Sequence, residues 1–312
     1  MDQHLRWGRR LRSYLTGEGL TEVINAPFTA REMNEYFHGL WSDQGKPVTL
    51  LNPLNQESSE MRLSLIPGLL ENLRLQLDQR ATSFSAFELG KVFHLNPKGS
   101  NEEITVLAGL LFGSRGQRGL RKGEFPFSFL DVKGILEGVL EATGTEDGTT
   151  WTSEGIPQFL HPGKATTLNQ NGRKMSYLGE IRPDLSSKLG VPPFLIFELD
   201  FESLVQYARL DLTVRALPRF PSVERDLAIV VDEKFPAQQV INWIKGFGNL
   251  LIEEVRIFDQ YRGSPIPEGK KSLAYTVSYR AKDRTLTDEE VNTIHQGLIS
   301  KMCPEFGATL RD

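Results

Sequence analysis

Residues 226–247 read DLAIVVDEKFPAQQVINWIKGF and contain two periodicities in succession. In residues 226–231 the alternation places Leu227, Ile229 and Val231 on one face, which predicts a β-strand. Residues 237–247 repeat apolar side chains at intervals of three and four, which predicts an amphipathic helix. Residues 226–247 are therefore expected to form a strand followed by a helix.

The sequence downstream completes a compact pattern. Residues 250–261 and 272–280 are expected to be strands separated by a Gly/Pro loop, and residues 308–311 a short final strand. Between them, Thr287 and Glu290 have the spacing of a capping box that opens a second helix. The resulting order is βαββαβ, which predicts a ferredoxin-like domain with both helices on one face of the sheet and the other face open.

The sequence upstream predicts a second domain of a different kind. Its elements form a sheet flanked by helices without regular βαβ alternation, so the fold class is α+β. Two prolines between basic residues in 213–222 mark a connector, which predicts domains at 1–212 and 213–312. Helices are expected at 5–14, 65–77 and 129–140, and strands at 21–28, 84–94, 104–112, 165–168, 174–181 and 194–201.

Composition limits the possible classes. The 312 residues include 36 Lys and Arg against 40 Asp and Glu, a net charge of −4 that excludes a wholly basic nucleic-acid coat. A local nucleic-acid surface remains possible, because the excess of acidic residues lies before Thr213. No apolar run approaches the roughly 20 residues of a membrane helix, and Cys303 is the single cysteine, so we expect a cytoplasmic protein without a membrane.

A search for catalytic motifs is negative. The chain has no G-x-x-x-x-G-K-[ST] or G-x-G-x-x-G loop, no H-E-x-x-H pair and no G-x-S-x-G elbow. The five histidines are scattered along the chain. We therefore expect no catalytic residues, no metal site and no cofactor in this chain.

Four segments in the last hundred residues resemble one known domain. Residues 220–231 (FPSVERDLAIVV), 258–263 (FDQYRG), 267–274 (PEGKKSLA) and 285–291 (TLTDEEV) resemble the ferredoxin-fold anticodon-binding domain of phenylalanyl-tRNA synthetase β subunits. Residues 51–55 (LNPLN), 61–70 (MRLSLIPGLL), 87–93 (FELGKVF) and 161–163 (HPG) resemble the class II synthetase-like module that precedes it. The chain thus looks like the C-terminal portion of such a β subunit.

This resemblance implies a division of labour. In the family the α subunit carries the class II catalytic motifs, so this chain alone is expected to be inactive, with ATP and Mg expected only in the holoenzyme. The implied partners are the synthetase α subunit, in an (αβ)₂ assembly, and tRNA(Phe). The helices at 69–77 and 129–140 are candidates for packing against the α subunit, but most of their residues are expected to lie in the core of this chain. A stand-alone RNA-binding adaptor and an amino-acid-sensing protein are the alternatives.

The resemblance also assigns a site in the last domain. Tyr261 would stack on the first anticodon base, Asp259 would read its polar edge, and Ala228 and Ser272 would line the neighbouring base sites. Phosphate contacts would come from Arg219, Arg225, Arg262, Lys270 and Lys271. A second cluster, Arg115, Arg118, Arg121 and Lys122 in a Gly-rich stretch, is interpreted either as a solvated loop or as a phosphate contact.

Alternation tests this assignment and leaves one conflict. In 272–280, alternation is expected to place the side chains on two faces. The core-facing set is Leu273, Tyr275, Val277 and Tyr279, and the open-side set is Ser272, Ala274, Thr276 and Ser278. In 250–261, strict alternation puts Asp259 and Tyr261 on the same face as Val255 and Ile257. A polar reading face and an apolar core face cannot coincide, so a β-bulge is one solution.

Overall fold

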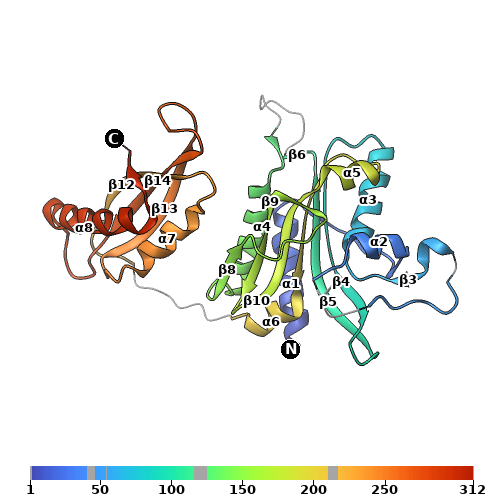
Figure 1. Ribbon diagram of the computed structural model, residues 1–312. Helices are drawn as coiled ribbons and strands as arrows, with labels where there is room; N and C mark the ends of the chain where they lie inside the picture. Colours follow the sequence, from blue (N-terminus) through green and yellow to red (C-terminus); the bar gives the residue numbers. More distant parts are fainter. Residues whose placement is uncertain (1, 41–45, 54, 116–124, 210–216, 312) are drawn as a thin grey trace. The chain divides into compact units, whose positions relative to one another are not determined.

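The computed structural model describes residues 2–40, 46–53, 55–115, 125–209 and 217–311. It divides into two compact units, Met1–Leu212 and Thr213–Asp312, here called unit 1 and unit 2. Each unit is described by itself (Figure 1).

Unit 1 is built on a seven-stranded sheet in the order β1-β4-β5-β11-β10-β9-β8. Strands β1 and β4 pair in parallel, and every other neighbouring pair is antiparallel. The predicted class, a largely antiparallel sheet with flanking helices, is confirmed. The strands are β1 (Thr21–Glu22), β4 (Phe84–Leu95), β5 (Asn101–Phe112), β8 (Thr149–Thr152), β9 (Leu160–Gln170), β10 (Arg173–Ile181) and β11 (Leu195–Asp200), with the small pairs β2 (Phe28–Thr29) and β3 (Glu60–Met61), and β6 (Ser114–Arg115) and β7 (Phe125–Pro126).

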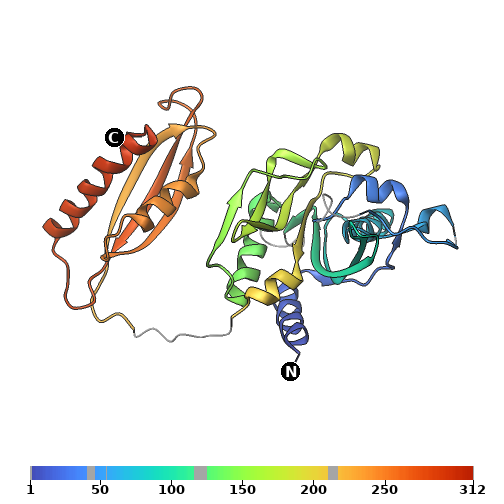
Figure 2. The same cartoon turned by 60° about the horizontal axis from the view of Figure 1, so that its bottom comes forward.

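Helices cover both faces of this sheet (Figures 1 and 2). On one face α1, α4 and α6 enclose a core that includes Leu107 and Leu111 of β5; on the other, α3 and α5 enclose a core that includes Val106, Ala108 and Leu110. A strand buried on both sides explains why residues 106–111 are apolar without alternation. The helices are α1 (Gln3–Gly17), α2 (Arg31–Tyr36), η1 (Gln56–Ser58), α3 (Ile66–Asp78), α4 (Phe129–Thr143), α5 (Pro183–Lys188) and α6 (Phe201–Tyr207).

The predicted strand at 21–28 is wrong in one respect. The structure places β1 in the large sheet and β2 in the small sheet with β3, so the chain changes sheets between Glu22 and Phe28. Proline at position 27 cannot donate a ladder hydrogen bond. The side chain of Asn25 instead donates to Glu88 Oε2 at 2.7 Å, which anchors the crossing segment to β4.

Unit 2 has the predicted ferredoxin-like architecture. Its sheet runs β13-β14-β12-β15, with every neighbouring pair antiparallel. Helices α7 and α8 pack into one core with the same face of the sheet. The elements are β12 (Val223–Asp232), α7 (Ala237–Gly246), β13 (Ile252–Tyr261), β14 (Lys270–Tyr279), α8 (Asp288–Phe306) and β15 (Thr309–Leu310).

The predicted start of the second helix of unit 2 is confirmed. Thr287 Oγ1 accepts from the backbone N–H of Glu290 at 3.3 Å, and Glu290 Oε2 accepts from the backbone N–H of Thr287 at 3.0 Å. This reciprocal pair satisfies two N–H groups that an α-helix leaves free at its N-terminus.

We expect Gly109→Ala to destabilise unit 1 by about 1–3 kcal/mol, because overpacking a filled core forces its neighbours to move. A Cβ at Gly109 would lie 2.2 Å from the buried ring of Phe197. The control is Gly134→Ala on α4, where nothing lies within 4 Å and helix propensity favours alanine. Urea denaturation of the full chain measures both, and equal midpoints would contradict the packing of β5 against β11.

We expect unit 2 to lose stability as the pH falls below about 6.5. Burial lowers the pKa of His295, whose Nδ1 accepts from Tyr279 Oη at 2.8 Å when the ring is neutral. Since the folded-state pKa lies below that of the unfolded chain, the contribution is complete above pH 6.5 and declines below it. The difference in melting temperature between the wild type and His295→Gln should therefore shrink from pH 7.5 to 5.5; a constant difference would contradict this.

Candidate nucleic-acid interface

The face of the unit 2 sheet that points away from α7 and α8, here called the open face, is organised in rows of three residues. The residues of a row pair in register across β12, β14 and β13, so their side chains share a face. Each row is named after its β13 residue. In order along the strands they are Glu224–Ser278–Glu254, Asp226–Thr276–Arg256, Ala228–Ala274–Asp259 and Val230–Ser272–Tyr261.

A β-bulge resolves the conflict left by the sequence. Ile257 pairs with Tyr275, whereas Asp259 pairs with Ala274, so two residues of β13 advance for one residue of β14. The extra residue is Phe258, and beyond it the alternation of β13 is reversed. Ile257 therefore lies on the core side, while Asp259 and Tyr261 lie on the open face with Ala228 and Ser272 in adjacent rows.

The ring of Tyr261 is held from two sides. Its hydroxyl donates to the backbone carbonyl of Ser264 at 2.8 Å, and the guanidinium of Arg311 lies 5.0 Å from the ring centroid. A cation over an aromatic face is attracted to its negative quadrupole. The Tyr261 side chain nevertheless keeps 38% of its surface accessible, so an aromatic platform is available on the open face.

Arg311 is a residue that the sequence reasoning missed. Its backbone N–H donates to the carbonyl of Ala228 at 3.0 Å, and its Nη1 donates to Ser272 Oγ at 3.4 Å. It thereby contacts three of the four residues assigned by resemblance. The sequence offered one indication of its place: Arg311 directly follows the last strand, β15, and β15 pairs with β12, the strand that carries Ala228.

Ser272 differs from expectation in its accessibility. It lies on the open face by register, but only 2% of its surface is exposed. Because its hydroxyl already accepts from Arg311, a base would meet the guanidinium before it met the serine.

Two of the five candidate phosphate contacts do not lie on the open face. Arg225 pairs in register with Val277, a core residue, and forms an ion pair with Asp288 and a 3.0 Å hydrogen bond from its Nε to Asn292 Oδ1. Arg225 therefore joins β12 to the start of α8. The expected position of Arg225 beside the reading face is not observed, because alternation sends its side chain to the helix side.

Lys271 is the second such residue. It pairs in register with Val231, another core residue, and is only 8% exposed. Burial and the neighbouring charge of Arg262 lower the pKa of its ammonium group. The other three candidates are more exposed than Lys271. Lys270 pairs with Asp232, and alternation along the two strands puts both residues on the open face. Arg262 forms an exposed ion pair with Glu233 at 3.4 Å, and Arg219 is exposed in the segment before β12.

Most of the Arg-rich Gly stretch lies outside the described residues. Arg118, Arg121 and Lys122 belong to the part that is not described. Arg115 is described, and its Nε lies 3.0 Å from Asp131 Oδ1, which ties it to the start of α4.

Unit 1 contains buried carboxylates, but they are engaged in internal contacts. Glu198 has no exposed surface and accepts from Ser64 Oγ at 3.0 Å, the Leu65 N–H at 2.9 Å and Tyr177 Oη at 2.6 Å. Burial raises the pKa of Glu198. Arg62 and Glu88, both buried, form an ion pair at 2.8 Å. Buried charges are retained when they are paired and hydrogen-bonded, so this network is a structural element of the sheet.

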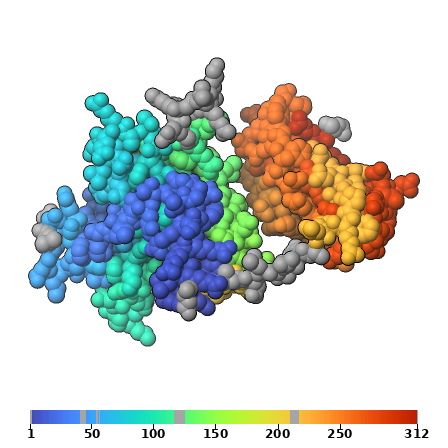
Figure 3. Space-filling model, turned by 180° about the vertical axis from the view of Figure 1, so that it is seen from behind, coloured from blue at the N-terminus to red at the C-terminus, as the bar shows by residue number. Residues whose placement is uncertain are grey.

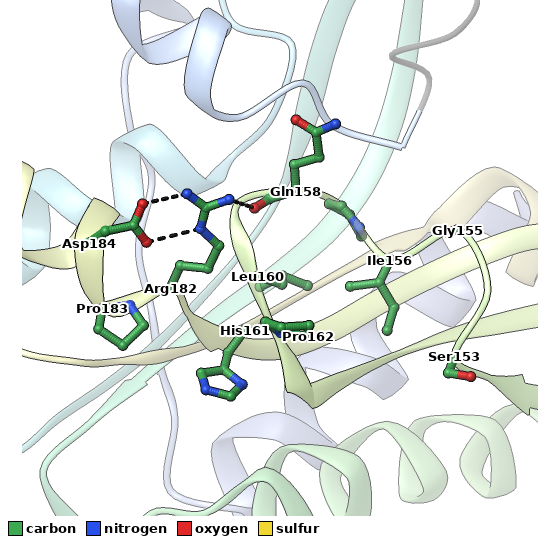
Figure 4. Close-up of a pocket in the computed structure, with 11 residues that line it drawn as sticks. Ser153, Gly155, Ile156, Gln158, Leu160, His161, Pro162, Arg182, Pro183 and Asp184 are labelled. Atoms are coloured by element: carbon green, nitrogen blue, oxygen red, sulfur yellow. Dashed lines mark hydrogen bonds and ion pairs between the residues drawn. The ribbon is translucent and has the colours of Figure 1, made fainter. Parts of the chain in front are cut away.

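Figure 4 shows an open groove of about 730 Å³ in unit 1, beside the start of β9 and the end of β10. Within it the Arg182 guanidinium pairs with Asp184 and donates to the carbonyl of Gln158 at 3.0 Å. This guanidinium lowers the pKa of Asp184 to about 2. His161 Nδ1 accepts from the Gly163 N–H at 3.0 Å. The lining residues present no nucleophile paired with a base.

Within the described ranges, no helix is both long and apolar enough to cross a membrane. Among these same residues, no three or more His, Cys, Asp or Glu side chains are grouped so that they could hold a metal ion.

Both units match domain families of aminoacyl-tRNA synthetases. Residues 2–201 match the family described as phenylalanyl tRNA synthetase beta chain CLM domain, and residues 218–311 match the ferredoxin-fold anticodon binding domain. The chain belongs to the family of phenylalanine–tRNA ligase β subunits.

The curated relatives agree along the whole chain. A phenylalanine–tRNA ligase beta subunit from Geobacter sulfurreducens is 37% identical over 99% of this chain, and one from Moorella thermoacetica is 38% identical over 98%. The alignments cover 39% and 38% of those proteins. The chain thus spans about two fifths of the length of the relatives it matches.

A solved structure of a pyrrolysyl tRNA synthetase from Desulfitobacterium hafniense is similar to 66% of this chain and 72% of its own. The TM-score is 0.47 and the sequence identity 17%.

Proposed function

We propose that this chain is the C-terminal part of a phenylalanine–tRNA ligase β subunit and that its unit 2 recognises the anticodon of tRNA(Phe) on the open face. The observation that carries the proposal is the reversal of β13 at Phe258. It brings an aromatic ring and a carboxylate, Tyr261 and Asp259, onto the same face as small residues of β12 and β14.

Each of these residues has a role that fits its chemistry. Tyr261 supplies a surface for stacking a base, and such stacking is worth roughly 1–3 kcal/mol. Asp259 is exposed, and its carboxylate oxygens can accept hydrogen bonds from base N–H groups. Ala228 and Ala274 have small side chains that leave room for a base beside Asp259. Ser272 and Arg311 line the next base position, beside Tyr261. Arg262, Lys270 and Arg219 contribute phosphate contacts around this face.

The proposed role of unit 1 is to hold the synthetase α subunit. Both candidate packing helices use most of their apolar side chains inside unit 1, α3 through Leu69, Leu70 and Leu73 and α4 through Leu136. Some apolar residues stay exposed and support a partner surface: Leu75 on α3 and Leu130 on α4, and, near the β2–β3 sheet, Phe28 in β2 and Leu51 after the segment bridged to β3. The first helices and strands, dark blue to blue, form much of the surface in Figure 3.

In the holoenzyme, an (αβ)₂ assembly in the cytoplasm, we propose that the α subunit performs the ligase reaction with ATP and Mg²⁺. The carboxylates described in unit 1 do not fit a magnesium site, because Glu198 and Glu88 are buried and already paired. This chain alone is then inactive.

The two alternatives, a stand-alone RNA-binding adaptor and an amino-acid-sensing protein, are not favoured. Both units match consecutive parts of the same kind of subunit, in the same order.

We expect Tyr261→Ala to weaken binding of the tRNA(Phe) anticodon stem-loop by roughly 5- to 150-fold, which corresponds to the loss of one stacked base. The matched control is Tyr261→Phe, which keeps the ring and removes only the hydrogen bond to Ser264, and should bind almost as the wild type. Titration of the full chain at fixed salt measures both. Equal affinity of Tyr261→Ala and wild type would refute the assignment.

We expect the purified chain to catalyse no phenylalanine-dependent exchange of pyrophosphate into ATP. The reason is that the class II catalytic motifs of the family belong to the α subunit, and that among the described residues no three or more His, Cys, Asp or Glu side chains are grouped to hold Mg²⁺. Co-expression with an α subunit should give a complex that copurifies and exchanges pyrophosphate. Exchange by the chain alone, resistant to removal of any contaminating α subunit, would contradict the proposed division of labour.

A further inference from the structure

We infer that the Arg256 row, formed by Asp226, Thr276 and Arg256, is a further nucleotide subsite on the open face. In this subsite Asp226 accepts a hydrogen bond from the edge of a base, and Arg256 contacts the adjoining phosphate. The inference rests on the proposed function, since it extends the same RNA track by one position beyond the Asp259 row.

The geometry of the sheet places this row in line with the other two. Successive rows on one face are two residues apart along a strand, about 6.8 Å in antiparallel sheets. The bulge at Phe258 lies between Arg256 and Asp259, and both still face the open side, because Arg256 pairs with Thr276 and Asp259 with Ala274. Some four-stranded sheets bind two or three bases of single-stranded RNA on one face by stacking them on aromatic side chains; in the Arg256 row hydrogen bonds would take the place of stacking.

The row carries complementary hydrogen-bonding groups. Thr276 Oγ1 donates to Asp226 Oδ1 at 2.8 Å, which orients the carboxylate across the row. Asp226 is exposed, and an ionised carboxylate accepts several hydrogen bonds, so it retains capacity for a base N–H. The neighbouring rows on either side have different chemistry, so this combination of acceptor and guanidinium is specific to the Arg256 row.

Arg256 forms ion pairs on the open face, yet much of its side chain remains accessible. Its Nη2 lies 3.3 Å from Glu224 Oε1 and its Nε lies 3.6 Å from Glu254 Oε1. The side chain remains 57% exposed, and exposed ion pairs contribute only about 0–1 kcal/mol. Because more than half of the side chain is exposed, the guanidinium can bind a phosphate in addition to these carboxylates, with two parallel hydrogen bonds.

The next row ends the track. Glu224 and Glu254 place two carboxylates on it, with Ser278 buried between them and donating to Glu224 at 3.2 Å. Like charge at this position disfavours a further phosphate. The RNA path therefore extends from the Tyr261 row to the Arg256 row and stops there.

The test uses the full chain and stem-loops with the anticodon of tRNA(Phe), each anticodon base also being replaced in turn. Arg256→Gln should weaken all the RNAs about three- to tenfold and reduce the slope of log affinity against log salt by about 0.7. Asp226→Asn should instead reduce the preference for the cognate base about fivefold or more at one anticodon position and leave the other two unchanged.

The control is Arg284→Gln, which makes the same change of charge. Arg284 is similarly exposed and also lies between two carboxylates, Asp283 at 3.5 Å and Glu290 at 2.7 Å, but it precedes α8. It should leave the salt slope unchanged. Circular dichroism checks that each variant is folded.

The outcomes separate the two proposals. If Tyr261→Ala weakens binding while Arg256→Gln behaves as Arg284→Gln and Asp226→Asn keeps full discrimination at every position, the Arg256 row is not a subsite and the proposed function stands. If the wild type binds the cognate stem-loop no better than one with a scrambled loop, both proposals fail together.

Discussion

Strand β14 constrains the whole of unit 2, because it pairs along its length with β12 on one side and β13 on the other. Its residues Leu273, Tyr275, Val277 and Tyr279 have no exposed surface, while the residues between them are small or hydroxylic. A slip of one residue would exchange these two sets between core and open face. The burial of four large side chains therefore sets the register in which every row of the open face is assembled.

Within that register, the bulge at Phe258 decides which chemistry the open face presents. Before it, β13 contributes Val255 to the core; after it, the same strand contributes Asp259 and Tyr261 to the opposite side. An edge strand can accept an extra residue because only one of its sides is hydrogen-bonded, and bulges are used to redirect side chains in this way. The bulge allows one ten-residue strand to serve both a core and a binding surface.

Unit 1 shows how a sheet with buried carboxylates can be structural. Glu198 is surrounded by three donors, and Arg62 neutralises Glu88 between β3 and β4. The removal of one member would leave a buried charge without a partner, which is costly. These groups join the start of α3 to the sheet, so they have a structural role inside unit 1.

The sequence by itself determined the element order of unit 2, both of its helix faces, the capping box at Thr287 and the alternation of β14, since each depends on periodicity or on contacts between near neighbours. It left open the parity of Asp259 and Tyr261, because strict alternation conflicted with their polarity. Only the tertiary structure decided the bulge, the place of Arg311 over Tyr261, and the turn of Arg225 and Lys271 away from the open face. These features depend on which strands pair and on the position of the last residues of the chain beside β12. Contacts between residues so far apart in the sequence leave no local periodic pattern.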